Sequence, residues 1–110
     1  MTIALDSYSS SKVGFHMYLI ALADQIADVR HRIDQDVKDA TLDKFQQQAF
    51  AFISERLDEM ERECRTGKLK AAELRYAELA RIAVETDPAL LPPDLGGQLI
   101  DVERKYQRAR

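Results

Sequence analysis

Histidine and cysteine, which commonly bind transition metals, are few in this chain, and the two histidines are far apart. His16 and His31 fall on one predicted helix, and the fifteen residues between them correspond to about 22 Å, too far to share a metal ion. Asp28 and His31 have the i, i+3 spacing of carboxylate-bridged metal bundles, but such sites need a second pair of this kind. The sequence has no second pair, so we predict no metal site.

A calcium loop and a cysteine nucleophile are also disfavoured. The string from Asp34 to Phe45 has acidic residues at its first and third positions, as a calcium loop does. It has Asp39 where glycine is required, however, and Phe45 where a bidentate glutamate is required. The only cysteine, Cys64, falls on the apolar side of a predicted helix, which favours a packed side chain over a nucleophile. With no phosphate loop and no nucleophile beside a base, we predict a binding module, not an enzyme, and no cofactor.

The composition is that of one folded domain spanning residues 1–110. Hydrophobic residues make up 45% and charged residues 32% of the chain, which is enough for a single modest core. The longest apolar run, residues 17–23, is far shorter than the about 20 residues that cross a bilayer, so we expect no membrane association. No secretory signal is visible, and a lone cysteine suits a reducing compartment, so the expected location is the cytoplasm. We expect residues 1–11 to be a poorly ordered lead-in.

Charge is distributed unevenly along the chain, although the net charge is only −3. Residues 34–63 include nine acidic and four basic residues, whereas residues 65–81 include five basic and two acidic ones. An acidic centre disfavours nucleic acid as a partner and favours a basic protein surface. Simple solvated helix faces are the alternative explanation. The candidate partner-binding residues are the acidic group Asp34, Asp36, Asp39 and Asp43, with Tyr8 and Tyr18 as aromatic anchors.

Apolar residues recur at helical spacing along the chain, and no stretch alternates long enough for a strand. The first predicted helix spans residues 12–37, with Ser10 or Ser11 as its N-cap. The second follows a cap at Thr41 and ends near Gly67, where a positive φ is expected. The third predicted helix spans residues 69–86 and should pack beside the second, because the connection between them is short.

All three prolines and two of the four glycines fall in residues 85–97, just before the last helix. Asp87 followed by Pro88 predicts a capped turn, and the later prolines limit it to one turn. Leu90 is a candidate core residue of this joint. Asp94 is the expected cap of the last helix, residues 95–108. The predicted fold is an all-α four-helix bundle, mostly antiparallel, with a Pro/Gly-rich joint before its last helix.

The predicted core follows one apolar side of each helix. Its members are Phe15, Leu19, Leu22, Ile26, Val29 and Ile33; Leu42, Phe45, Ala49, Ile53, Leu57, Met60 and Cys64; Leu69, Ala72, Tyr76, Leu79 and Ala83; and Leu95, Leu99, Val102 and Tyr106.

The stretch LARIAVETDPAL, residues 79–90, resembles a segment of the small helical immunity proteins that bacteria carry against NAD(P)+ glycohydrolase toxins of type VI secretion. Those proteins have an apolar helix end, an acidic-Thr-Asp-Pro-x-Leu turn and a final helix with a tyrosine. The matching residues here are Ile82, Ala83, Glu85, Thr86, Asp87, Pro88, Leu90 and Tyr106. A weaker similarity covers residues 47–57, and LPPDLGG, residues 91–97, looks like an insertion.

The resemblance implies an immunity protein that binds one cognate toxin domain in the producing cell and blocks its active site without catalysis. The toxin would be an NAD(P)-degrading or other nucleotide-targeting enzyme. A helical adaptor or self-associating structural protein, including a homodimer, stays open as an alternative. A small metal-dependent enzyme is a third reading, for which the sequence supplies no ligand set.

Overall fold

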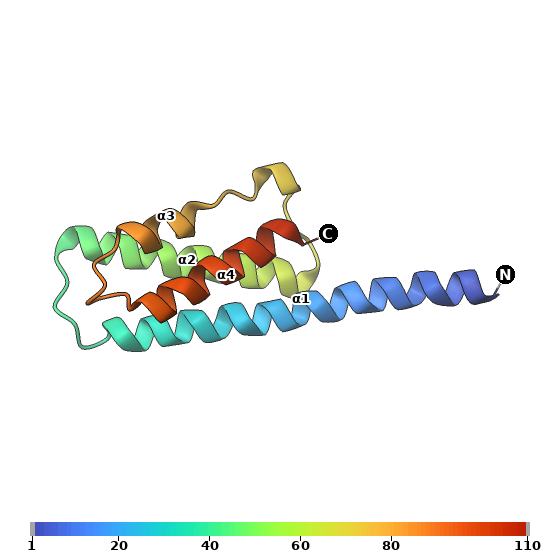
Figure 1. Ribbon diagram of the computed structural model, residues 1–110, viewed down its shortest axis with the longest axis horizontal. Coiled ribbons are helices and arrows are strands. Elements are labelled where there is room, and N and C mark those ends of the chain that lie inside the picture. The colour runs from blue at the N-terminus through green and yellow to red at the C-terminus, as the bar shows by residue number, and fades with distance from the viewer. Residues whose placement is uncertain (1, 110) are drawn as a thin grey trace.

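The computed structural model describes the backbone of residues 2–109 and the side chains of residues 13–109. Over this range the chain forms four α-helices, one 3-10 turn and no strand, which confirms the predicted all-α class (Figure 1). The elements are α1 (Thr2–Val37), α2 (Lys44–Thr66), η1 (Ala72–Leu74), α3 (Glu78–Glu85) and α4 (Pro93–Arg108). None of the described helices is long and apolar enough to cross a membrane.

The helices pack as a bundle around α1 and α4. α2 and α4 both pack along α1. The sequence predicts that the third helix packs beside α2, whereas α3 packs chiefly on α4. The first part of α1 extends beyond the other helices, which makes the molecule 62 Å long and only 25 by 21 Å across (Figure 1). The α1–α2 connection and the α3–α4 connection lie at the end of the bundle remote from the N-terminus (Figure 1).

The first helix begins earlier than predicted. α1 starts at Thr2, so an N-cap at Ser10 or Ser11 is wrong. A serine in a helix interior lowers helix stability by only about 0.5 kcal/mol relative to alanine. The serine run therefore does not interrupt the helix. The expected poor order of residues 1–11 stays a prediction.

α2 is capped by Asp43 and not by Thr41. The Asp43 carboxylate accepts a hydrogen bond from the Gln46 amide at 2.7 Å, and the Gln46 side chain accepts one from the Asp43 amide at 3.0 Å. This reciprocal capping box needs Glu or Gln three residues after the cap, and Thr41 has Lys44 at that position. At the other end, the positive φ predicted at Gly67 is confirmed, with a value of 72°.

The third helix is much shorter than predicted, because Arg75 takes the chain out of helical conformation. Its guanidinium donates to the carbonyl of Lys70 at 2.8 Å and to those of Tyr106 and Ala109 at 3.0 and 2.6 Å. The last two carbonyls belong to the C-terminal end of α4, where helical partners are missing. Residues 69–86 therefore form η1, an extended stretch and the two-turn α3.

The α3–α4 connection contains the predicted turn. The Asp87 carboxylate accepts a hydrogen bond from the Ala89 amide at 2.9 Å. The backbone carbonyl of Asp87 accepts hydrogen bonds from the amides of Leu90 and Leu91. α4 then starts at Pro93 with Pro92 as its N-cap residue, one half-turn before the predicted start. The predicted cap at Asp94 is wrong, since that residue lies in the first turn of α4.

The core confirms the predicted apolar sides of α1, α2 and α4, with several exceptions. The buried apolar residues are Leu19, Leu22, Ala23, Ile26, Val29, Ile33, Phe50, Ile53, Leu57, Met60, Cys64, Leu79, Leu91, Leu95, Leu99, Val102, Tyr106 and Ala109. Phe45, Ala72 and Tyr76 are wrongly predicted to be core, because all three are exposed. Leu90 is only half-buried, and the neighbouring Leu91 is the core residue, 3% exposed.

Candidate functional site

The described residues contain no arrangement suited to metal binding. No group of three or more His, Cys, Asp or Glu side chains among them is close enough to hold an ion. His16, Asp28 and His31 are all exposed on α1.

Cys64 is buried in the core, and the carboxylate of the adjacent Glu63 adds to the effect of burial. Together they raise the pKa of the Cys64 thiol to about 11 from an ordinary value of 9.0. We expect the native protein to react with a thiol reagent such as DTNB at least about a hundredfold more slowly than the unfolded chain at pH 8. Equal rates in the two states would show that Cys64 is accessible and that the core around it is open.

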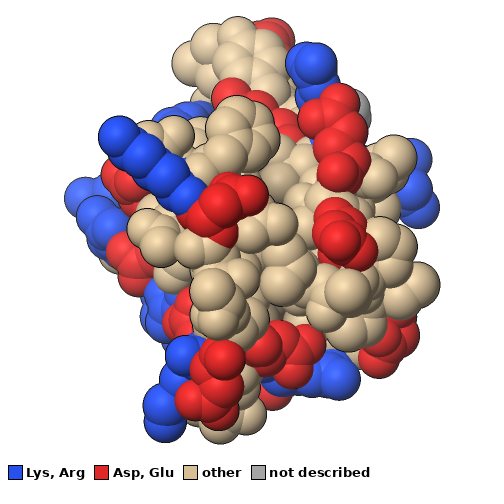
Figure 2. Space-filling model, turned by 90° about the vertical axis from the view of Figure 1, so that its left-hand side faces the viewer, with Lys and Arg blue, Asp and Glu red and all other residues tan. Residues whose placement is uncertain are grey.

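The predicted acidic residues lie at one end of the bundle. Asp34 and Asp36 are near the end of α1, Asp39 is in the following turn and Asp43 caps α2, and all four are exposed. Figure 2 shows that acidic side chains surround uncharged surface on this end face, with lysine and arginine mostly toward its margins. The four residues therefore lie around the α1–α2 connection, and their role in binding stays a prediction.

Tyr18 does not join this acidic end. Tyr18 is exposed on α1, but sixteen residues of helix separate it from Asp34, a distance of about 24 Å. The side chain of Tyr8 lies outside the described residues. The structure thus separates the predicted aromatic anchor Tyr18 from the predicted steering charges.

A groove that the sequence reasoning missed opens at the acidic end, between the start of α2 and the end of α3. It encloses about 550 Å³, and we call it the α2–α3 groove. Phe45 and Phe52 from α2 line it, with exposed fractions of 81% and 41%. Its other lining residues are Asp43, Gln46, Gln48, Ala49, Phe50, Ile82, Glu85, Thr86, Asp87 and Leu90.

A sequence signal for this groove existed. Phe45, Ala49 and Phe52 have the i, i+4, i+7 spacing of one helix face, and that face lies beside the one of Ile53 and Leu57 that enters the core. Glu85 at the end of α3 and Asp87 in the following turn could not be assigned to the site from sequence, since they are more than forty residues from Asp43.

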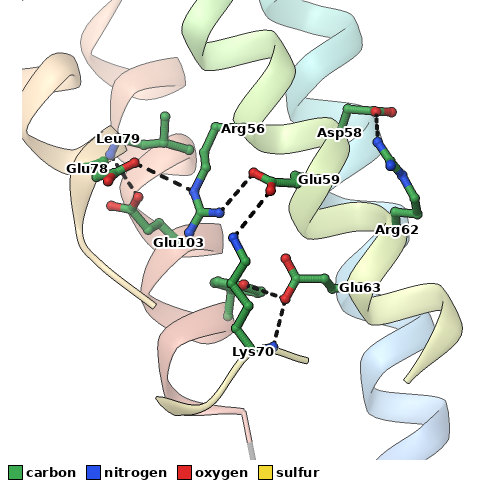
Figure 3. A network of polar contacts seen from close by, with 10 residues as sticks. Arg56, Asp58, Glu59, Arg62, Glu63, Lys70, Glu78, Leu79 and Glu103 are labelled. Carbon is green, nitrogen blue, oxygen red and sulfur yellow. Dashed lines mark hydrogen bonds and ion pairs between the residues drawn. The ribbon is translucent and has the colours of Figure 1, made fainter. Parts of the chain in front are cut away.

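A buried carboxylate holds the start of α3. Glu103 of α4 is 1% exposed and accepts hydrogen bonds from the amides of Leu79 and Ala80 at 2.8 and 2.9 Å (Figure 3). Burial raises the pKa of Glu103, and the two amide hydrogen bonds oppose that shift. Glu103 therefore caps a helix that has no side-chain cap of its own.

Arg56 connects the start of α3 to α2. Its side chain is 7% exposed and lies over the Tyr106 ring, with the guanidinium carbon 5.5 Å from the ring centre. Its Nη1 donates to Glu59 at 3.3 Å, and its Nε lies 3.9 Å from the Glu78 carboxylate at the start of α3 (Figure 3). Charged contacts thus position the start of α3 relative to α2 and α4, and the α2–α3 groove opens beside the end of α3.

The Tyr106 hydroxyl completes this network on the side of α2. It donates to the Glu63 carboxylate at 2.8 Å, and the same Glu63 oxygen accepts from the Lys70 amide at 2.9 Å (Figure 3). Burial, together with this contact to Glu63, raises the pKa of the Tyr106 hydroxyl, which stays a donor at neutral pH. The tyrosine predicted as a core residue of the last helix is therefore also a buried polar link.

Comparison with protein-family models, curated proteins and solved structures finds no match to this chain. The resemblance to immunity proteins is therefore supported only by the matching residues in the stretch 79–90 and by Tyr106. The structure places them at the end of α3, in the following turn and in α4.

Proposed function

We propose that this chain is a protein-binding module that acts as an immunity protein, blocking the active site of one cognate toxin in the producing cell's cytoplasm without catalysis. The observation that supports this best is the gathering of exposed carboxylates at one end of the bundle, next to exposed phenylalanines. Complementary charge accelerates the encounter with a basic protein, and a few aromatic anchors supply most of the affinity. The resemblance of residues 79–90 favours an NAD(P)-degrading or other nucleotide-targeting toxin.

The finer arrangement of the helices belongs to this proposal as well. We infer a mostly antiparallel bundle, in which the Pro/Gly-rich segment is the joint that sets the direction of α4. The short connection between α1 and α2 supports this order, since such connections join antiparallel neighbours. Asp87 of this segment and Asp43 line the same groove at the acidic end, which supports this arrangement.

Reversing two charges of the acidic end tests this proposal. The double variant Asp36→Lys and Asp39→Lys is expected to lower the association rate constant with the toxin domain about tenfold at low salt, because long-range attraction is lost. The salt dependence of association should become flatter. Stopped-flow fluorescence measures both quantities.

A matched variant separates local charge from net charge. Asp28→Lys with Glu73→Lys makes the same change in net charge at exposed positions of α1 and η1. Its association rate constant should stay well above that of the acidic-end variant. If the two double variants associate equally fast, the acidic end does not steer binding.

Self-association is the second candidate function, because apolar side chains remain exposed on the first part of α1. Val13 and Met17 are both exposed there. Light scattering after size-exclusion chromatography distinguishes the two proposals. A monomer at micromolar concentration favours the immunity protein, and a stable dimer favours the self-associating adaptor.

A further inference from the structure

The α2–α3 groove continues along α2 toward η1. A second hollow of about 310 Å³ shares Phe52 with it and reaches Leu74 and Tyr76, both exposed. The residues of α2 and its cap that line the two hollows run from Asp43 to Glu59. Sixteen residues of helix span about 24 Å, so the groove can accommodate about four turns of a helix laid along it.

The two hollows together expose four large apolar or aromatic side chains. Phe45, Phe52, Leu74 and Tyr76 are exposed, and α3 packs chiefly on α4 rather than on α2. Exposed apolar surface of this kind, bordered by polar residues, is typical of protein interaction sites.

The charges at the groove identify the kind of partner. The hollow at Phe45 is bordered by Asp43, Glu85 and Asp87 and by no basic residue, and of these three carboxylates Glu85 pairs with the exposed Arg81 of α3 at 3.2 Å. The hollow at Tyr76 has three carboxylates, while its two cations, Arg56 and Lys70, both already contact Glu59. The border is therefore negative overall, and it complements a basic partner.

We propose that the α2–α3 groove binds one face of a basic amphipathic helix from a partner protein. Apolar side chains at i, i+3, i+4 and i+7 of that helix would pack against Phe45 and Phe52, and its lysines or arginines would face Asp43, Glu85 and Asp87. A second copy of this chain fits less well, since two such grooves face to face would bring like charges together. An anionic membrane is disfavoured by the same carboxylates.

This docking mode goes beyond the proposed immunity function, because it holds for any partner that presents such a helix. The probe is a synthetic peptide of about 18 residues with leucines at helical spacing on one face and lysines on the other. Titration of the isotope-labelled full chain should move amide NMR signals of residues 44–55 and 82–87. A peptide of the same composition in scrambled order should bind at least about tenfold more weakly, since it cannot place its leucines on one face.

Two matched variants test the anchoring residues. Phe45→Ser removes an exposed groove residue and is expected to weaken peptide binding about tenfold. Val84→Ser removes an apolar residue that is 78% exposed on α3 but does not line the groove, and it should leave the affinity within about twofold. Both residues are exposed, so both variants should fold, and circular dichroism checks this.

Three outcomes would overturn the inference. The first is equal affinity of the scrambled peptide, and the second is equal affinity of the Phe45→Ser and Val84→Ser variants. The third is concentration-dependent movement of the same signals without peptide, which would identify a second copy as the occupant. None of these bears on inhibition of a toxin, so failure of the groove and failure of the proposed function are distinguishable.

Discussion

Replacing Glu103 with alanine is expected to lower the free energy of unfolding by about 2–4 kcal/mol, because one buried and one partly buried amide donor lose their acceptor. The amides are those of Leu79 and Ala80 in the first turn of α3, which has no other side-chain cap. Water entering the space left by the side chain would restore part of the loss, so the full cost of two unpaired donors is not expected. Urea unfolding followed by circular dichroism measures the change.

Two further variants distinguish hydrogen bonding from the loss of a charge on α4. Glu103→Gln keeps one acceptor oxygen but presents an NH₂ group to the other amide, so an intermediate loss of about 1–3 kcal/mol is expected. Asp101→Ala removes an exposed carboxylate on α4 and should change stability by no more than about 0.5 kcal/mol. If Glu103→Ala were no more destabilising than Asp101→Ala, Glu103 would not hold the start of α3.

Replacing Leu91 with alanine should cost about 2–4 kcal/mol, whereas Leu90→Ala should cost about 1 kcal/mol. Leu91 is almost fully buried. It packs against Gly96 of α4, since a Cβ atom added to Gly96 would lie 3.8 Å from the Leu91 Cδ2. Leu90 is half-buried and lines the α2–α3 groove, so water remains near it in the native state. Thermal and urea unfolding of the two variants side by side provide the comparison.

The difference between the two leucines reports how the α3–α4 connection docks. A large loss at position 91 with a small one at 90 places the connection against the core through Leu91. Small and equal losses at both positions would mean that the connection does not pack on the bundle.

Much of the fold could be predicted from sequence where local periodicity decides the structure. The apolar repeats at Leu19, Leu22 and Ile26 of α1 and at Leu95, Leu99 and Val102 of α4 point into the core as predicted. The turn at Asp87 also has a local cause, a carboxylate followed by proline. Such elements can be predicted from sequence because the residues that determine them are close together in the chain.

The third helix could not be predicted, because its determinants are distant in sequence. Residues 69–86 have a helical apolar pattern, yet Arg75 binds carbonyls at the end of α4, and Glu103 caps α3 from 24 residues away. These contacts involve charged side chains, which a hydrophobic pattern assigns to the surface. Tertiary hydrogen bonds therefore override local propensity in this segment.

The candidate site was also predictable only in part. Asp34, Asp36 and Asp39 surround one helix connection, so their proximity follows from sequence. Phe45 lies within the capping box of α2, between Asp43 and Gln46. Its exposure depends on α3 packing chiefly on α4 and not on α2, which the chain order does not reveal. The groove is thus a consequence of the broken third helix.

We expect the gene immediately upstream to encode the toxin domain, and titration of that domain with this chain tests the central claim most directly. Its NAD(P)+ turnover, measured while this chain is added in increasing amounts, is predicted to fall linearly to the background rate at a one-to-one ratio. Unchanged turnover at several-fold molar excess of this chain, or a housekeeping enzyme at that position, would contradict the proposed function.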